Sequence, residues 1–482
     1  MPNMTAGENV SPSGLPPRPE QRLRLALAMH ASGPPDPAIL REICHALIAL
    51  QRDDELLPWA EQGLTLGPRD ADFLAMRASA LNLLGRHAEA ADAWSRVPVA
   101  PGVTAPNQLR IGYARMMAGD LPRAIRMLDD ARRAAAPDNA QLAAQAEHYL
   151  GEAMLKAGDP RGFTHWLMRN DDPSAAASYV PDDVPAWRGE HDLQGRRVLI
   201  THQLGFGDNF LLAACLADWV SAGAQVMITC DAQAHALMQA SLPDCEVVGA
   251  ERPSQLRSAL PEAARSRVDA FAPHLYATLL HLPLMRAAQA TSAYRFRPYL
   301  QAPLAKRRIA AQWARQLRAA HPGKRLVGVF WDCMQRHQPE LGSRMRCWAA
   351  RRSMPVDAIN RIAAAPTVAD HVHFVNLHHP LVATYAGIPT GNVSPYLPGI
   401  WHFDDTAACI GELDAVIAVD SAVANLAAMM AKPTCVPVNT SADWRWGSRG
   451  TSSPWIGNAT VLRQRREGDW TTVVQDLTTW LR

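Results

Sequence analysis

The sequence predicts an α + α/β protein, in which an array of paired helices precedes two α/β halves with parallel sheets. Alanine and leucine recur at helical spacing as far as about Trp166, and this part of the chain repeats with a period of 34 residues. Beyond Arg197, short apolar or β-branched runs alternate with amphipathic stretches. The alternation restarts after about residue 305, which indicates a second sheet.

The domain boundaries follow from these changes in residue pattern along the chain. At 482 residues the chain is long enough for about three domains. We predict a disordered segment at 1–20, helical repeats at 21–168, a linker at 169–195 that is rich in proline, aspartate and glycine, a first α/β domain at 196–305 and a second at 306–482.

Composition excludes several classes of protein. The 48 Lys and Arg residues against 46 Asp and Glu give a net charge of +2, so no global field attracts nucleic acid or an anionic membrane. The eight cysteines include no CxxC pair, which favours reduced thiols and a cytoplasmic location. The N-terminus lacks the apolar core of a signal peptide, and we expect no transmembrane segment.

The helical repeats have turn glycines and small contact residues. The stretch from Ala71 aligns with the stretch from Ala105, a third copy follows after a short insertion, and "HALIALQRDDELLPWAEQGL" fits a weaker first copy. The inter-helix turns carry Gly85, Gly119 and Gly158, and the expected helix contacts carry Ala80, Gly112 and Gly151. This pattern resembles the tetratricopeptide repeat, whose stacked helix pairs leave a groove for a peptide or protein. A plain helical bundle is the alternative.

The strand candidates form two sets. The first comprises "RVLIT", "QVMIT", "CEVVG" and "VDAFAP", and the second "RLVGVFW", "HVHFVNL", "LDAVIAVD" and "TCVPVN". Two Rossmann-like halves in tandem predict the GT-B architecture, in which ligands lie beyond the carboxyl ends of the strands. The final "GDWTTVVQDLTTWLR" predicts a terminal helix.

The stretch "HQLGFGDNFLL" reads as a glycine turn between a strand and a helix. Gly205 and Gly207 permit tight backbone geometry, as in phosphate-binding turns. Asp208 at the helix start would repel a phosphate there, but it suits the helix dipole and leaves an oxygen to accept a proton. Asp208 is equally explained as an ordinary helix N-cap.

Three further segments are candidate ligand sites. At Asp420 and Ser421 a strand ends and a helix with small residues in its first turn begins, where amides and a hydroxyl suit phosphate oxygens. The loop 441–455 carries three tryptophans and two arginines, which suit a base, a sugar or phosphate but also simple packing. The basic segment 331–355 suits a leaving diphosphate or is a solvated loop. His371 and His373 lack a ligand set for zinc, so no metal site is expected.

Taken together and in order, these segments resemble a known family. The chain is similar to bacterial proteins that join tetratricopeptide repeats to a glycosyltransferase domain related to ADP-heptose heptosyltransferases and, more distantly, to O-GlcNAc transferase. The matching pieces, in order, are "LGFGDN", "PHLYATLLHLPL", "PYL", "RRSMPV", "VNLHH", "FDDTAACIGELDAVIAVDSAVANLAA", "ADWRWGSRGTSSPW" and "GDW". The resemblance spans about Trp187 to Arg482. It implies inverting, metal-independent sugar transfer from a nucleotide-sugar, which acts as co-substrate with no further cofactor.

The resemblance also implies residue roles. Asp208 matches the family's proposed base, with Gly205, Gly207 and Asn209 shaping the turn at the cleft. The positions that match donor-binding segments are Asp420, Ser421, Asn425, Arg352, His378, Asp443, Trp444 and Arg445.

The chain departs from the family pattern at several of these positions. Asn425 replaces a histidine, Ala428 a glycine and His378 a glutamine, and Asp332 and Cys333 replace a small glycine turn. An asparagine keeps hydrogen-bonding ability but cannot shuttle protons.

We therefore expect a glycosyltransferase whose repeats present a protein acceptor, such as flagellin or another bacterial surface protein. A sugar transferase acting on lipopolysaccharide or another glycan is the alternative within the enzyme class. A catalytically inactive repeat scaffold that binds protein partners is the alternative outside it.

Overall fold

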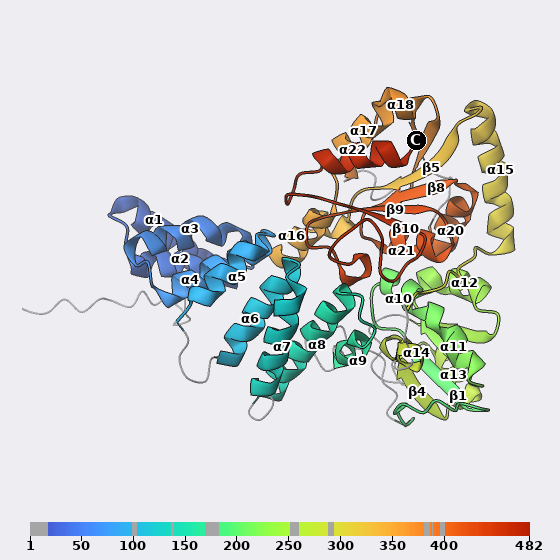
Figure 1. Ribbon diagram of the computed structural model, residues 1–482, viewed down its shortest axis with the longest axis horizontal. Coiled ribbons are helices and arrows are strands. Elements are labelled where there is room, and N and C mark those ends of the chain that lie inside the picture. The colour runs from blue at the N-terminus through green and yellow to red at the C-terminus, as the bar shows by residue number, and fades with distance from the viewer. Residues whose placement is uncertain are drawn as a thin grey trace, which may run out of the picture.

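A computed structural model describes residues 18–98, 104–135, 139–168, 183–250, 260–287, 294–379, 386–387, 389–395 and 401–482. Figure 1 shows three parts, a helical array that leads into a lower and an upper α/β domain. The predicted fold class, a tetratricopeptide-like solenoid followed by two Rossmann-like domains, is confirmed by the order and topology of these elements. No helix in the described ranges combines the length and apolarity needed to cross a membrane.

The solenoid consists of consecutive antiparallel helices with glycine turns between partners. Its helices are α1 (Pro19–Ser32), α2 (Pro37–Ala49), α3 (Leu56–Leu66), α4 (Ala71–Leu83), α5 (His87–Arg96), α6 (Thr104–Met117), α7 (Leu121–Ala135), α8 (Ala140–Lys156) and α9 (Gly162–Trp166). Gly85, Gly119 and Gly158 have φ of +79°, +81° and +82°, which explains why glycine recurs there. Gln51 holds the same place in the first copy at φ +54°. Helix α1 begins inside the segment predicted as disordered, and residues 1–17 lie outside the described ranges.

Small residues set the closest helix contacts of the solenoid. A Cβ on Gly112 would lie 2.8 Å from the Leu128 side chain, and one on Gly151 would collide with the backbone of Trp166. Ala80 is completely buried. The predicted small-residue contacts between paired helices are therefore confirmed at Gly112 and Gly151.

The first α/β domain has one four-stranded parallel sheet in the order β3-β2-β1-β4. Its elements are β1 (Arg197–Thr201), α10 (Phe206–Leu212), α11 (Leu216–Ser221), β2 (Gln225–Cys230), α12 (Ala232–Ser241), β3 (Cys245–Gly249), α13 (Glu262–Phe271), β4 (Leu275–Thr278) and α14 (Leu284–Ala287). The prediction of a strand at "VDAFAP" is wrong, because α13 continues to Phe271. Ala264 and Val268 share the buried face of this helix, which ends at Ala272 with φ +47°.

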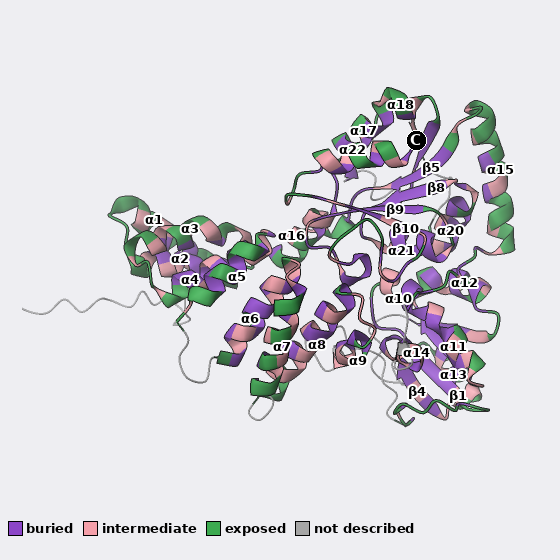
Figure 2. Ribbon diagram, in the orientation of Figure 1, coloured by how far each residue is buried: buried purple, intermediate pink, exposed green. Residues whose placement is uncertain are grey.

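The second α/β domain has a six-stranded parallel sheet in the order β10-β9-β8-β5-β6-β7. Numbered within the domain this is 3-2-1-4-5-6 read from the other edge, the doubly wound order, with its switch point between β5 and β8. The elements are α15 (Leu304–Ala320), β5 (Arg325–Phe330), α16 (Ser343–Arg352), α17 (Val356–Ala364), α18 (Pro366–Ala369), β6 (Val372–Asn376), β7 (Val393–Ser394), α20 (Phe403–Glu412), β8 (Ala415–Ala418), α21 (Ala422–Met429), β9 (Thr434–Val438), β10 (Ala459–Arg463) and α22 (Thr471–Trp480). The central strands are buried, whereas α15 keeps an exposed outer face (Figure 2).

The turns of the solenoid dock along the second domain. The carbonyl of Gln51 accepts a hydrogen bond from the Ser343 amide at 3.1 Å. Gly85 lies against Arg351, and a Cβ on Gly158 would lie 3.3 Å from Pro454. One edge of the solenoid therefore runs against the loops of the second domain.

An aromatic cluster joins all three parts. Phe163 in α9 lies with its ring centroid 5.6 Å from that of Tyr294, 5.7 Å from that of Trp444 and 5.2 Å from that of Trp455. The described end of the predicted linker also packs inward, since the Trp187 amide donates to the Tyr276 carbonyl at 2.8 Å. The three parts thus share one continuous apolar core.

Candidate functional site

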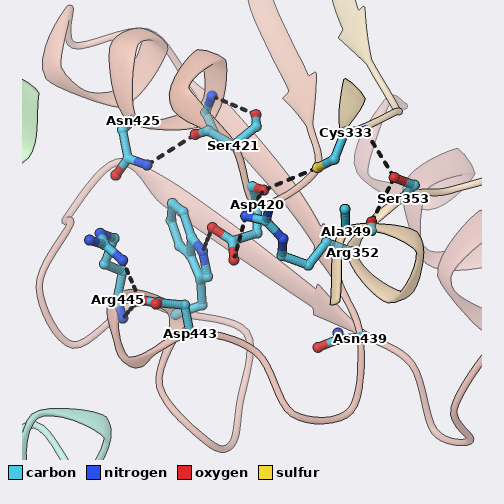
Figure 3. A network of polar contacts seen from close by, with 12 residues as sticks. Cys333, Ala349, Arg352, Ser353, Asp420, Ser421, Asn425, Asn439, Asp443 and Arg445 are labelled. Atoms are coloured by element: carbon cyan, nitrogen blue, oxygen red, sulfur yellow. Dashed lines mark hydrogen bonds and ion pairs between the residues drawn. The ribbon is translucent and has the colours of Figure 1, made fainter. Parts of the chain in front are cut away.

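The candidate site lies at the switch point of the second sheet, where Asp420 is the second residue after β8. The carboxylate is buried and accepts a hydrogen bond at Oδ1 from Trp446 Nε1 at 2.7 Å. Arg352, at the end of α16, donates to the Asp420 carbonyl at 3.2 Å, and its Nη1 lies 3.9 Å from Oδ2 (Figure 3). Parallel strands bring their carboxyl ends to one edge, which explains why these distant residues meet.

Cys333 braces this arrangement from the end of β5. Its amide donates to Ser353 Oγ at 2.8 Å, and its thiol lies 3.8 Å from the Asp420 carbonyl. Burial raises the pKa of the Cys333 thiol, so the group stays protonated and unreactive. The departure at this position is consistent with a structural role that holds α16 and the β8 loop together.

A cavity of about 270 Å³ opens beside Asp420, between the solenoid and the second domain. The second domain contributes Trp348, Arg351, Arg352, Asp420, Asn439, Ser441, Ala442, Asp443 and Trp444. The solenoid helices α6 and α8 contribute Tyr113, Met116, Met117, Tyr149, Glu152 and Lys156. Of the predicted donor-binding residues, Asp420, Arg352, Asp443 and Trp444 line this cavity.

Charged groups dominate the polar lining. Burial, reinforced by the charge of Asp420, raises the pKa of Asp443 to about 7. Burial lowers the pKa of Lys156 to about 8. Both groups therefore change protonation close to neutral pH, which is frequent at functional sites.

A chain of ion pairs connects the cavity to the first domain. Arg445 contacts Asp443 with one nitrogen and Asp208 with another. The Asp208 side chain is 26% exposed. The predicted base and the predicted donor loop thus come together, although Asp208 does not itself line the cavity.

Glycine is required at the start of α10 for a different physical reason from the one predicted. Neither Gly205 nor Gly207 has a positive φ, so neither is required by the backbone conformation of the turn. Gly207 lies in the first turn of α10, where a Cβ would be 3.3 Å from Ala422 Cα and 2.9 Å from Asn425 Nδ2. Its role is close approach to α21 across the domain boundary. Asn209 is buried and donates to the Leu204 carbonyl at 3.1 Å.

Ser421 and Asn425 lie on the other side of that contact. Ser421 is the N-cap of α21, its hydroxyl accepting from the Ala424 amide at 3.4 Å. Asn425 is buried and donates to the Ser421 carbonyl at 3.0 Å. Neither residue lines the cavity, because the start of α10 covers this end of the helix.

His378 lies in the core of the second domain and does not line the cavity either. It has no exposed surface, its ring stacks on Phe330 at 4.2 Å, and Nε2 accepts from the Asp332 amide at 3.2 Å. Burial lowers the pKa of His378 to about 3, which keeps the ring neutral. In this position His378 packs against the end of β5 and does not contact the cavity.

The cavity residues of the solenoid were not predicted from the sequence. Arg351 falls within the basic segment already noted, but Lys156, Glu152 and Tyr113 carry no local signal. They become site residues only through docking of the solenoid, which helical periodicity does not reveal. Within the described ranges, no group of three His, Cys, Asp or Glu side chains is placed to hold a metal ion.

Comparison with known proteins finds solved structures with a similar fold. No protein-family model matches the chain, and no curated protein matches it. Solved structures that resemble it include a family 9 glycosyltransferase from Veillonella parvula, with 13% identity, a TM-score of 0.40 and coverage of 59% of this chain and 90% of that one. The E. coli ADP-heptose lipopolysaccharide heptosyltransferase II matches with 13% identity, a TM-score of 0.40 and coverage of 59% and 98%.

Another resembling structure extends over both the repeats and the α/β domains. A Thermobaculum terrenum O-GlcNAc transferase matches with 13% identity and a TM-score of 0.27, covering 97% of this chain and 94% of that one. The chain is thus similar to proteins of the kind that its sequence resembles. At these identities and TM-scores the likeness carries no argument about activity, which rests on the site.

Proposed function

We propose that the protein is an inverting glycosyltransferase that binds a nucleotide-sugar in the cavity beside Asp420. The observation that carries the proposal is the ion-pair chain from Asp443 through Arg445 to Asp208, which links a charged cavity at the switch point of one Rossmann-like sheet to an acid of the facing domain. Ligands of doubly wound sheets bind at such switch points.

In the proposed reaction Asp208 takes the proton of the acceptor hydroxyl. The acceptor oxygen then forms a bond to the anomeric carbon from the face opposite the diphosphate, whose bond to that carbon breaks with inversion. The diphosphate departs with the electron pair, and Arg351 and Arg352 neutralise its charge. Arg445 orients the Asp208 carboxylate, and no metal ion takes part.

The acceptor is proposed to be a protein, such as flagellin, presented through the solenoid. Support comes from the solenoid itself, since stacked helical repeats generally bind peptides or proteins. Transfer to lipopolysaccharide or another glycan is the second candidate, and an inactive scaffold is the third. Mass spectrometry of flagellin and of glycan acceptors after incubation with donor separates the first two.

The decisive experiment is a binding and transfer screen with UDP-, GDP-, ADP- and CMP-sugars. We expect one class to bind by calorimetry and to be hydrolysed or transferred by the wild type, and Asp208→Asn to keep binding while losing transfer. Absence of binding by every class would refute the glycosyltransferase proposal. Binding with equal turnover in wild type and variant would refute only the role of Asp208.

A further inference from the structure

Lys156 is the last residue of solenoid helix α8, and it faces the cavity without a fixed partner. Its side chain is 5% exposed and lines the cavity beside Asp443 and Arg351. Neither a hydrogen bond nor an ion pair joins its ammonium group to any residue in the described part of the chain. A buried cation without a partner is costly, which suggests that a ligand supplies the missing anion.

Two acids, Asp443 and Glu152, act on Lys156 through their charges and raise its pKa, but no hydrogen bond to its ammonium group is present in the described part of the chain. Asp443 contacts Arg445, and Glu152, one turn earlier on α8, lies 3.4 Å from His148. The other charged groups that act on Lys156 are Arg463 and Arg351, both cations. The ammonium group of Lys156 therefore has acids nearby but no side chain in direct contact within the described ranges, so its hydrogen bonds are left for a ligand in the cavity.

Three cations surround the same space from two parts of the protein. Arg351 is held by Glu467 at 2.8 Å and by His87 at 2.9 Å, and Arg352 stacks on Trp348 with its guanidinium carbon 3.2 Å from the ring centroid. These contacts hold the two guanidinium groups in place without a ligand. Lys156 lies among the cavity residues that come from the solenoid. A group with several anionic oxygens can bridge such a set, and a diphosphate is one.

We propose that Lys156 binds a phosphate oxygen of the donor's diphosphate, so that the solenoid forms part of the donor site. This inference rests on the proposed function. It assigns to the repeat array a role distinct from presenting the acceptor. Donor affinity then depends on how the solenoid is docked, as well as on the residues of the second α/β domain.

The first test uses the full-length chain with UDP, GDP, ADP and CDP and the matching nucleosides. For the diphosphate that binds the wild type, we expect Lys156→Met to weaken affinity about thirtyfold, because a charge-assisted hydrogen bond is lost. Nucleoside affinity should change less than threefold, and Lys156→Arg should retain most diphosphate affinity. Lys324→Met is the matched control, since it removes a half-buried lysine outside the cavity lining whose ammonium group donates to the Ala369 carbonyl at 2.7 Å.

The second test is pH dependence, with a nucleotide-sugar as probe because its diphosphate diester has no proton to lose between pH 6 and 9. The pKa of Lys156 is about 8, so wild-type affinity should fall as pH rises through 8 and the ammonium loses its proton. Asp443, with a pKa of about 7, adds a fall around pH 7 as its negative charge appears. Lys156→Arg should abolish the step near 8, and Asp443→Asn the step near 7.

The outcomes separate the two proposals. A wild type that binds no nucleotide overturns the proposed function. A wild type that binds, with Lys156→Met binding equally well, overturns only the role of Lys156. Weakened binding of UDP-glucuronate with unchanged binding of UDP-glucose would assign Lys156 to a sugar carboxylate and overturn the diphosphate contact. If Lys156→Met fails to fold, the Lys156→Arg pH profile decides, and a step near pH 8 that persists in that variant overturns the proposal.

Discussion

The two parallel sheets share the order of their first four strands, yet their carboxyl edges differ. In the first domain this edge is filled by protein, where His202 is buried with Nδ1 2.8 Å from Thr229 Oγ1 and Asn209 bonds to the backbone. In the second domain the equivalent edge borders a cavity beside Asp420, closed on one side by the solenoid. The two sheets thus share a topology, and the neighbouring part of the chain determines whether the carboxyl edge is filled by protein or borders a cavity.

The largest expected effect is on the rate of transfer, and it follows from removing the charge of Asp208 in the first domain. Asp208→Asn should lower transfer by about 10²- to 10⁴-fold, the usual range for losing a general base, while donor affinity changes little. Turnover and calorimetric affinity are the two measurements. Asp231→Asn is the control, because Asp231 is an acid of the same edge whose carboxylate lies 3.5 Å from His202. A larger loss from Asp231→Asn than from Asp208→Asn would show that the base is misassigned.

The next effect tests the second edge. Asp420→Asn should weaken donor binding about tenfold or more, since it removes a buried charge that orients Arg352 and accepts from Trp446. Trp446→Phe removes the indole hydrogen bond and part of a buried ring but keeps the Asp420 charge, so it should have a smaller effect on affinity. Equal affinities of wild type and Asp420→Asn in calorimetry would exclude the cavity as the donor site.

A stability effect tests the contact between the two domains. Gly207→Ala should lower the free energy of unfolding by about 1–3 kcal/mol, as overpacking does, because its Cβ meets α21. Gly205→Ala is the matched control two residues away, where the nearest atom to a Cβ lies at 3.5 Å and φ is –62°. Thermal unfolding of both variants measures the difference. Equal stabilities would show that α10 and α21 do not meet this closely.

The smallest effect tests the docking of the solenoid. Gly85→Ala and Gly119→Ala both place a side chain at positive φ, which costs about 1–2 kcal/mol of stability in each. Only the Cβ of Gly85→Ala would crowd Arg351, at 2.7 Å from Nε, whereas the nearest atom at Gly119 is 4.0 Å away. Donor affinity should therefore fall in Gly85→Ala alone. Equal affinities would show that the turn does not position Arg351.

The sequence predicts most of the fold because its signals are local. The recurrence of Gly85, Gly119 and Gly158 follows from positive φ, and the strands read as apolar runs of the right length. The strand at "VDAFAP" is mispredicted because an apolar run at the end of a helix looks like a short strand. Strand β7 has two residues, too few to form a pattern, and β10 is missed although its five residues match β1 in length.

The site was predicted in part, for a physical reason. Asp420 and Arg352 meet because strand ends share an edge, which is predictable from topology. Lys156 and Arg351 acquire their positions through docking between parts distant in sequence, which no local pattern records. The sequence predicts Gly207 as a turn residue, whereas glycine is required there by close contact with α21, a helix more than 200 positions away.

The aromatic cluster around Phe163 makes the α/β domains dependent on the repeats for their solubility and stability. Tyr294, Phe296, Trp444 and Trp455 would face water if the repeats were removed, and the indole of Trp455 would lose its bond to the Leu155 carbonyl at 3.0 Å. A truncation that retains only residues 183–482 is then expected to aggregate. Because the repeats and both α/β domains share this cluster, heating the intact chain should unfold all of them in a single cooperative transition. A substitution that destabilises the repeats should therefore destabilise the α/β domains as well.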